Sequence, residues 1–435
     1  MSQHIALISE HASPLSALGG VDSGGQNVYV GQVARHLSQR GFLVDVFTRR
    51  DTAELPPLVS LAHNLRVIHV PAGPPSYVAK EDMLDLMPGF TRWMEGFIRA
   101  QGRYDLIHAN FFMSGLVAAD LKRRLDIPFV ITFHALGKVR LQHQGVHDRF
   151  PRERPAMEGR LMEEADAIIA ECPQDQEDQC RLYGADPAKM RLVPCGFDRG
   201  EMYPVDRREA RQIIGVPLNE PLVMHIGRMV PRKGVDSALE GFARLIHVHK
   251  LSARMMIVGG ESEEPDPRLT PEIGRLSVFA NELGVADRVT FTGRRGREAL
   301  RYYYSAGDVF VTVPWYEPFG ITPVEAMACG VPVVGSAVGG IKYTVAPGRT
   351  GFLVPPNEPA ELGARLFQLL TLPRLRARLG EAGRLRAQEL FTWERVTAQL
   401  ADVYQEVWAR RAAAAHSSVD LSPLLWSTTN SQTTT

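Results

Sequence analysis

Short apolar, β-branched runs recur along the chain, and the segments between several of them carry apolar residues at a helical period. Val30, Val33, Ala34 and Leu37, for example, stand at i, i+3, i+4 and i+7, which places them on one stripe of an amphipathic helix. Buried strands that alternate with such helices predict a parallel, doubly wound sheet. The first series of predicted strands covers 5–9, 43–48, 65–70, 105–110, 129–134, 167–172 and 190–195.

A second alternating series begins after a polar, irregular stretch at 200–220. We therefore predict an α/β protein with two Rossmann-like doubly wound parallel-sheet domains, 1–200 and 201–391, that face each other across a cleft. We predict a closing helix at 392–411, which packs back toward the first domain, and a disordered tail at 412–435. The second series of predicted strands covers 222–227, 255–260, 289–293, 308–314, 331–336 and 351–355.

Composition narrows the class of protein. Lys plus Arg number 49 and so do Asp plus Glu, which gives a net charge of zero. This balance predicts no nucleic-acid partner, and it does not exclude weak peripheral contact with a membrane. No run is long and apolar enough to predict an export or transmembrane segment. The cysteines lack C-x-x-C spacing and a nearby histidine pair, so neither a disulfide scaffold nor a zinc site is predicted and the cytoplasm is the expected location. Nothing in the sequence indicates an oligomeric state.

The pair Gly24 and Gly25 stands between the first predicted strand and the first predicted helix. A helix N-terminus carries unpaired N–H groups and the positive end of the helix dipole, and glycines there let an anion such as phosphate approach the backbone. The pair fits a tight strand-to-helix turn equally well, because glycine is the default turn residue. The pattern is not G-x-G-x-x-G, so a second site has to decide.

Two cations bracket a loop in the segment GRMVPRKG, where a predicted strand ends at Gly227. Arg228 offers a planar fork for phosphate oxygens and Lys233 a point charge, a combination that suits a diphosphate. Loop cations taken alone are more often simply solvated.

Two glutamates, Glu317 and Glu325, stand eight positions apart in EPFGITPVEAMACG. Thr322, Pro323 and Glu325 fit the N-cap, N1 and N3 positions of a capping box, which gives Glu325 a structural role. Glu317, which follows a strand beside the amides of 320–322, would accept hydrogen bonds from sugar hydroxyls while those amides hold phosphate.

Together with TFHALG, which contains His134, these segments resemble the retaining glycosyltransferases of family 4, which have the GT-B fold. The resemblance runs from residue 5 to about 408 and is nearest in style to D-inositol 3-phosphate glycosyltransferases and sucrose-phosphate synthases. It implies the catalytic residues His134, Arg228, Lys233 and Glu317. It implies the donor-binding residues Gly24, Gly25, Gly227, Arg294, Phe319, Gly320, Ile321, Thr322 and Glu325. It implies the acceptor-binding residues Asn27, Lys80, Phe111, Lys138 and Arg154.

The resemblance also implies what each donor contact does. Gly25 would lie against the donor's β-phosphate or the transferred sugar, and Arg228 and Lys233 would stabilise the charge that develops on the leaving diphosphate. Glu317 would contact the sugar near its 3- and 4-hydroxyls, and Glu325 the ribose. A D-x-D motif is absent from the sequence, which agrees with a metal-independent site that needs no cofactor. A UDP-sugar is the first donor to expect, with GDP- and ADP-sugars as alternatives.

His134 ends a predicted strand, where a histidine is often a satisfied core residue. The Ala-Leu-Gly that follows it and its place in the resemblance favour a hydrogen bond to the 6-hydroxyl edge of the sugar.

The resemblance weakens at the acceptor. In the inositol-phosphate enzymes a Lys, a Tyr and a Thr contribute to the phosphate site; here Lys80 matches, but Phe111 and Ala135 replace the two hydroxyl residues. Inositol 3-phosphate is therefore not the expected acceptor. Lys138 and Arg154 either receive another phosphorylated or acidic sugar or are solvated surface charges.

The favoured function is retaining, metal-independent transfer of a hexosyl group from a nucleoside diphosphate sugar to a hydroxyl of a small sugar, sugar phosphate or polyol. No convincing carboxylate nucleophile for a two-step displacement is visible, so the resemblance implies a front-face reaction. The alternatives are an isomerase on the same fold, similar to a nucleotide-sugar 2-epimerase, and a catalytically silent nucleotide-sugar-binding protein. A dinucleotide oxidoreductase ranks last because the G-x-G-x-x-G fingerprint is missing.

Overall fold

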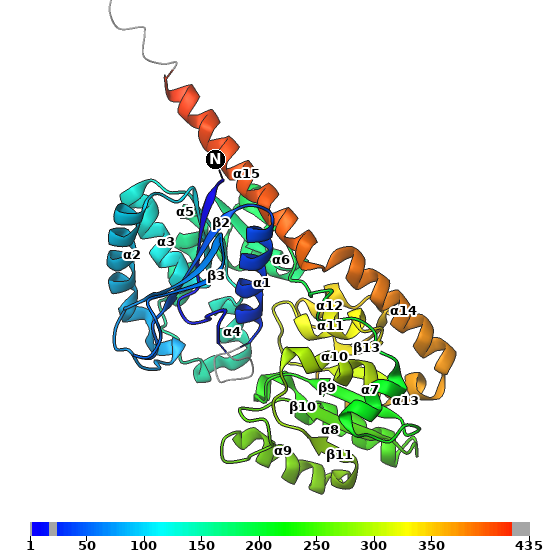
Figure 1. The fold of residues 1–435 in the computed structure, drawn as a ribbon. Helices are drawn as coiled ribbons and strands as arrows, with labels where there is room; N and C mark the ends of the chain where they lie inside the picture. Colours follow the sequence, from blue (N-terminus) through cyan, green and yellow to red (C-terminus); the bar gives the residue numbers. More distant parts are fainter. Residues whose placement is uncertain (1, 17–23, 420–435) are drawn as a thin grey trace, which may run out of the picture.

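The computed structural model describes residues 2–16 and 24–419, which fold into two α/β lobes with one sheet each (Figure 1). The first sheet has the strand order β3-β4-β2-β1-β5-β6-β7-β8. Its strands are β1 (His4–Ile8), β2 (Leu43–Arg49), β3 (Leu58–Ala62), β4 (Leu65–Val70), β5 (Leu106–Asn110), β6 (Phe129–Thr132), β7 (Ala167–Ala170) and β8 (Met190–Leu192). Its helices are α1 (Gly25–Gln39), α2 (Met87–Gln101), α3 (Phe112–Leu125), α4 (Gly137–Gln144), α5 (Arg154–Glu164) and α6 (Pro173–Tyr183).

The second sheet has the strand order β11-β10-β9-β12-β13-β14. Its strands are β9 (Leu222–Ile226), β10 (Arg254–Val258), β11 (Val289–Phe291), β12 (Val309–Thr312), β13 (Val333–Ser336) and β14 (Gly351–Val354). Its helices are α7 (Arg207–Ile214), α8 (Val235–His247), α9 (Pro271–Glu282), α10 (Arg297–Ala306), α11 (Ile321–Ala328), α12 (Ile341–Thr344), α13 (Pro359–Thr371) and α14 (Pro373–Leu390). The last helix, α15 (Trp393–Val419), leaves this lobe.

Both predicted sheets are confirmed, and every strand predicted from the sequence is present. The strand that the sequence analysis missed is β3, which pairs antiparallel with the edge of an otherwise parallel sheet. Most of its residues are exposed, so it lacks the buried apolar run on which the other predictions rested.

Alternating side chains of the first sheet enter two different cores. Ile5 and Leu7 of β1 pack with α1, whereas Ala6 and Ile8 pack with α2 and α3 on the opposite face. The α1-side core continues without a break into the second lobe, so the lobes share one apolar cluster near their junction.

The chain crosses between the lobes twice, and the two crossings pair with each other. Phe197 N–H donates to Phe391 O at 2.8 Å, and Trp393 N–H returns a bond to Phe197 O at 3.2 Å. A side chain at Gly196 would come within 2.9 Å of Phe391 O, so glycine permits this close approach. The predicted domain boundary at residue 200 falls within the first crossing, between β8 and α7.

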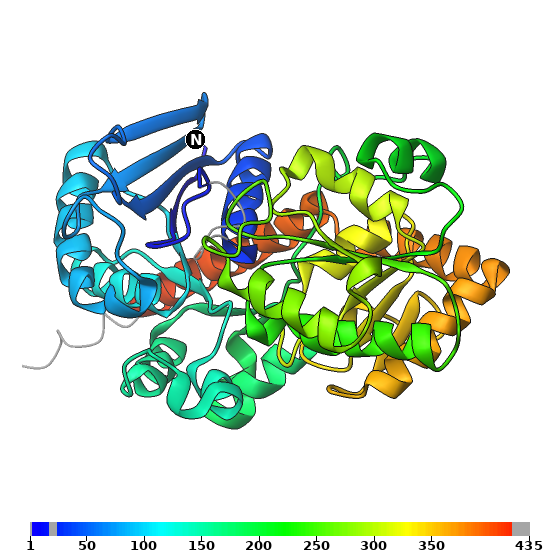
Figure 2. The ribbon, with the colours of Figure 1, turned by 90° about the horizontal axis from the view of Figure 1, so that it is seen from below.

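Helix α15 runs from the second crossing along the first lobe, as both ribbon views show (Figures 1 and 2). It packs on α1. The hydroxyl of Tyr404 lies 2.7 Å from His108 Nδ1, and Trp408 Nε1 donates to Asp105 O at 2.9 Å. The prediction of a disordered tail is wrong for 412–419, because the alanine-rich sequence there continues the helix to Val419. The rest of that predicted tail, 420–435, lies outside the described residues. No helix in the described part of the chain has the length and apolarity to cross a membrane.

Candidate active site

The glycine pair caps α1 and faces the second lobe. Gly24 is the N-cap residue, with a φ of −161°, and neither Gly24 nor Gly25 has the positive φ that favours glycine. A side chain at Gly24 would lie 3.4 Å from Arg228 Nε, and one at Gly25 would lie 3.6 Å from Ile321 Cδ1. Backbone conformation therefore does not require these glycines, and their lack of side chains instead lets α1 lie close to Arg228 and Ile321 of the second lobe.

Asn27 fastens this turn. Its Oδ1 accepts a hydrogen bond from Gly24 N–H at 2.9 Å, and its Nδ2 donates to Ser13 O at 2.9 Å. The residue is buried, so its amide is used within the protein. Asn27 thus has a structural role at the N-terminus of α1, and its acceptor contact stays a prediction.

A partly buried ion pair joins two loops of the second lobe. Lys233 lies at the end of the short 3-10 turn Pro231–Lys233, and its Nζ binds Glu317 Oε2. Arg232 Nη1 lies 3.5 Å from the same oxygen and also donates to Tyr316 O at 3.2 Å. The left-handed turn at Gly234 has no room for a side chain, because a Cβ there would overlap Val313 O. The predicted cation loop and the predicted sugar glutamate therefore meet directly.

The charges of this cluster act on one another. Burial lowers the pKa of Lys233 to about 8, although the attraction of Glu317 opposes the shift and the nearby charges of Arg232 and Arg228 add to it. Burial by itself would raise the pKa of Glu317, but Lys233, Arg232 and Arg228 outweigh it, so the pKa lies below its ordinary value. Positive charge thus accumulates at the strand ends of β9 and β12, where an anionic ligand would be stabilised.

The helix after Glu317 begins earlier than expected. Gly320, at a φ of +90°, is the N-cap of α11, and Ile321 and Thr322 form its first turn. The capping box predicted from Thr322 and Glu325 is wrong, because the left-handed glycine starts the helix and moves Glu325 past the N3 position. Phe319 is buried and packs against Phe391, with ring centroids 5.9 Å apart, and this contact anchors the loop between Glu317 and α11.

Glu325 is buried and has two partners on or beside α10. Tyr304 O–H donates to Glu325 Oε2 at 2.9 Å, and Arg297 Nη2 forms an ion pair with Glu325 Oε1 at 3.0 Å. Burial raises the pKa of Tyr304 well above its ordinary value, and the negative charge of Glu325 adds to this effect. The carboxylate therefore belongs to a residue past the capping positions of α11 and is held by α10.

His134 stands just after β6 with a positive φ of 57°. Its Nδ1 lies 2.9 Å from Glu171 Oε1 and its Nε2 lies 3.1 Å from Asn110 Oδ1. The Asn110 amide is oriented by donating to Ile8 O at 3.2 Å, which turns its oxygen toward the histidine. Tyr29 packs edge-on against the ring, with centroids 4.8 Å apart. The ring is thus fixed in position, and a backbone conformation that is uncommon for a side-chain-bearing residue accompanies it.

The basic residues expected at the acceptor side are engaged by protein groups. Arg154 is fully buried, with its guanidinium paired to Glu158 at 2.8 Å and enclosed by the rings of Phe111, Phe112 and Phe150. This burial contradicts the predicted acceptor contact of Arg154, because no face of the guanidinium reaches the cleft.

The remaining acceptor predictions fall on the first lobe as well. Lys138 Nζ donates to Leu182 O and lies 4.6 Å from the ring centroid of Tyr183, so Lys138 also turns into its own lobe. Lys80 Nζ lies 4.0 Å from Glu81 Oε1. Phe111 is buried and has a φ of 85° at the carboxyl end of β5.

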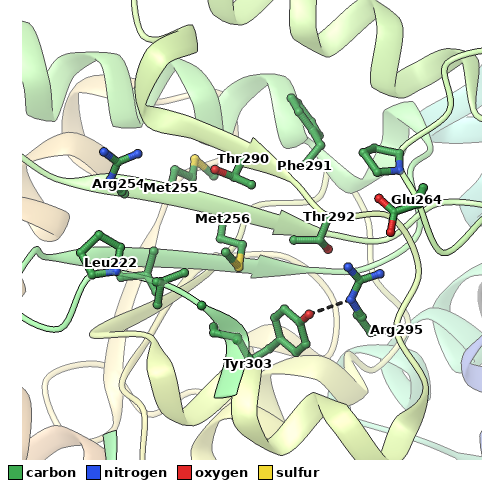
Figure 3. Close-up of a pocket in the computed structure, with 15 residues that line it drawn as sticks. Leu222, Arg254, Met255, Met256, Glu264, Thr290, Phe291, Thr292, Arg295 and Tyr303 are labelled. Carbon is green, nitrogen blue, oxygen red and sulfur yellow. Dashed lines mark hydrogen bonds between the residues drawn. The ribbon is translucent and has the colours of Figure 1, made fainter. Parts of the chain in front are cut away.

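A cavity of about 950 Å³ lies between the lobes, lined by α1 and the 294–299 segment. Of the predicted site residues, Asn27 and Arg294 line it, and Arg294 N–H donates to Ser262 O at 2.7 Å. A smaller cavity of about 340 Å³ lies on the second lobe beside β9, β10 and β11 (Figure 3). There Arg295 Nε points at Tyr303 and donates to its hydroxyl at 2.6 Å. None of the predicted catalytic residues lines the smaller cavity. Gly227, which follows β9, does not line it either, and its N–H donates to Val258 O at 3.0 Å.

Motif reading missed the partners that orient the site. Asn110 and Glu171 hold His134, Arg232 supports Glu317, and Arg297 and Tyr304 hold Glu325. Asn110 and Glu171 stand at or just after the carboxyl ends of β5 and β7, a position at which polar side chains reach the cleft. That signal was present in the sequence.

Two Rossmann-like lobes, the second with a partly buried cation cluster at its strand ends, form the arrangement of a GT-B glycosyltransferase, and the comparisons with known proteins agree. Residues 23–201 match the family model "Glycosyltransferase Family 4", and residues 206–386 match "Glycosyl transferases group 1". The chain is 36% identical over 410 residues to D-inositol 3-phosphate glycosyltransferase 2 of Catenulispora acidiphila, covering 93% of this chain and 95% of that protein. It is 37% identical to D-inositol 3-phosphate glycosyltransferase of Actinosynnema mirum, covering 92% and 97%.

A solved structure agrees with this assignment. The sucrose-phosphate synthase of Thermosynechococcus elongatus superposes with a TM-score of 0.86 at 35% identity, covering 94% of this chain and 100% of that one. The structure of Anabaena HepE in complex with UDP and glucose shares the fold, with a TM-score of 0.72 at 22% identity, covering 93% of this chain and 100% of that one. The chain belongs to the family 4 glycosyltransferases.

Proposed function

We propose that this glycosyltransferase moves a hexosyl group, with retention and without a metal, from a nucleoside diphosphate sugar to a hydroxyl of a small carbohydrate acceptor. The observation that carries the proposal is the Lys233–Glu317 pair, with Arg228 and the N-terminus of α1 beside it. Both parts of a nucleoside diphosphate sugar would have complementary groups here. The ammonium and guanidinium groups would bind the diphosphate, and the Glu317 carboxylate would accept hydrogen bonds from the sugar hydroxyls.

Charge stabilisation is the main chemistry that these residues supply. As the bond between the anomeric carbon and the diphosphate lengthens, negative charge grows on the leaving group, where Lys233 and Arg228 would hold it. The first amides of α1, at Gly25 and Gln26, have no carbonyl partner within the helix and would add their dipoles. The donor hydroxyls would bind Glu317, and the ribose would bind Glu325.

Retention is proposed through a front-face reaction. Among the described residues, the carboxylates nearest this chemistry are already paired, Glu317 with Lys233 and Glu171 with His134. Neither is free to attack the anomeric carbon as a glycosidase nucleophile does. The acceptor hydroxyl would instead give its proton to the departing phosphate oxygen as the new bond forms on the same face, and positioning supplies much of the rate.

The acceptor is proposed to be an uncharged small sugar or polyol, with sugar phosphates as the second class to test. Arg154 and Lys138 bind Glu158 and Leu182 O, which leaves them no role in holding a phosphate. UDP-sugars are the first donors to test, followed by GDP- and ADP-sugars. We place the reaction in the cytoplasm, which the free thiols of all four cysteines support.

A thermal-unfolding screen with UDP-, GDP- and ADP-sugars tests the donor, because a ligand that binds only the folded protein raises its melting temperature. We expect one nucleotide series to stabilise the protein, and NMR of the product to show the anomeric configuration of the donor. An inverted product would disprove retention. Conversion of the donor to an epimer without acceptor would favour the isomerase alternative instead.

A further inference from the structure

One arginine links the proposed ribose contact to the segment that connects the lobes. Arg297, the first residue of α10, donates from Nε to Glu201 Oε2 at 2.8 Å, while its Nη2 lies 3.0 Å from Glu325 Oε1. Glu201 belongs to the first crossing between the lobes, and both Glu201 and Arg297 line the large inter-lobe cavity. Arg297 therefore spans from the cavity wall to the buried Glu325 within α11.

The contact between Arg297 and Glu325 is an ion pair without a hydrogen bond. Glu325 Oε1 and Arg297 Nη2 are both buried, and neither has a hydrogen-bond partner in the described structure. The other carboxylate oxygen, Oε2, is occupied by Tyr304 O–H. The pair thus holds the charge of Glu325 in place and leaves the acceptor capacity of Oε1 unused, which is unusual for a buried carboxylate.

A hydroxyl group, such as one of those on a ribose, is the chemical group that this arrangement suits. A hydroxyl that enters beside Arg297 would donate to Oε1 and satisfy the unused acceptor, and the ionised carboxylate would make that bond stronger than a neutral one. Arg297 Nη2, 3.0 Å from Oε1, holds the carboxylate in place by charge attraction. Glu201 limits the directions in which the guanidinium can turn.

We propose that Arg297 is a positioning residue, which sets the preference of this enzyme for a ribonucleotide over a deoxyribonucleotide donor by holding Glu325 against the ribose. The inference deepens the proposed function and rests on it. Glu201 acts as the outer anchor of the same arginine, so its removal should weaken the preference without abolishing nucleotide binding.

Calorimetric titration with UDP, GDP and ADP, each beside its 2′-deoxy and 3′-deoxy forms, tests the inference. The wild-type protein should bind its preferred ribonucleotide at least about tenfold more tightly than one of the deoxy forms, as expected for loss of a charged hydrogen bond. In Arg297→Gln this ratio should fall below about threefold, and in Glu201→Gln it should fall to an intermediate value. A purely structural role for Arg297 would lower the affinity for both forms and leave their ratio unchanged.

The control is Arg254→Gln. Arg254 lines the smaller cavity, and its Nε lies 2.6 Å from Glu220 Oε2 (Figure 3). This variant should keep the wild-type ratio of ribonucleotide to deoxyribonucleotide affinity. Arg297→Gln removes a partner of a buried carboxylate and risks unfolding, so its melting temperature is measured first. If it does not fold, the partly exposed Glu201→Gln decides alone. Wild-type ratios in the folded variants would overturn the inference and leave the proposed function standing. Failure of the wild-type protein to bind any of the nucleotides would overturn both.

Discussion

Lys233 and Glu317 lie 84 positions apart in the chain, yet the ammonium of one is paired with the carboxylate of the other. Their loops follow β9 and β12, which are neighbours in the sheet. Both residues are proposed to bind the donor, one at its diphosphate and the other at its sugar. Their direct contact places the proposed diphosphate contact and the proposed sugar contact side by side.

Replacing Lys233 by Ala should lower kcat/KM by roughly 30- to 1000-fold, on the order of 2–4 kcal/mol, because one stabilising charge on the leaving group is lost. Steady-state kinetics with a saturating acceptor would measure it. The double variant with Glu317→Gln should cost less than the sum of the single changes, because the two groups interact. Near-normal turnover in a folded Lys233→Ala protein would contradict the proposed role.

Activity and stability should respond to pH in opposite directions above neutrality. Lys233 has a pKa of about 8 in the folded protein and an ordinary value of 10.5, so between these values the unfolded chain binds a proton that the folded chain does not. The contribution of Lys233 to stability therefore rises across that window, whereas donor binding falls as the ammonium loses its charge above pH 8.

A pH series of kcat/KM and melting temperature would measure both effects. Arginine keeps its charge throughout this range, so Lys233→Arg, although less active, should lack the alkaline decline. A decline at the same pH in that variant would assign the titration to another group.

Gly25→Ala should impair the reaction while leaving the fold intact. The new Cβ would lie 3.6 Å from Ile321 Cδ1, an ordinary contact, and Gly25 has no positive φ to strain. It would, however, project into the space where the donor phosphate is proposed to approach α1. We expect kcat/KM to drop by about 100-fold, or about 2.7 kcal/mol, with little change in melting temperature.

The matched control is Gly96→Ala in α2, where a new Cβ meets no atom within 4 Å. It should leave activity unchanged and stabilise the helix slightly. If Gly25→Ala behaved like this control, the glycine pair would be a turn and no more.

Arg154→Met should destabilise the protein without weakening acceptor binding. The change leaves Glu158 buried without its guanidinium partner, which typically costs about 3–5 kcal/mol. Chemical denaturation would measure the loss, and kinetics at a temperature where the variant is folded would show an unchanged acceptor KM. An unaltered stability with a strongly raised acceptor KM would return Arg154 to the acceptor site.

Activity should persist in excess EDTA, because Lys233, Arg228 and Arg232 would supply the positive charge that a divalent cation provides elsewhere. Initial rates before and after dialysis against chelator would measure this. Loss of activity that Mn²⁺ restores would disprove a metal-independent reaction.

Local sequence patterns determined the strands, the helix α1 and the place of the cation loop, because apolar periodicity and glycine positions act over a few residues. The same locality explains two failures. Strand β3 exposes both of its faces and carries no burial signal, and the start of α11 depends on Gly320 adopting a left-handed conformation, which a capping-box pattern conceals.

Only the tertiary structure decided which charges are available to a ligand. Arg154 and Glu158 stand at a helical i, i+4 spacing that is visible in the sequence, but their burial comes from Phe111 and Phe150, on other segments. The pairing of Lys233 with Glu317 likewise depends on the order of strands in the sheet. A charge is solvated or paired according to neighbours that sheet order and lobe packing bring together, and short-range patterns do not contain that information.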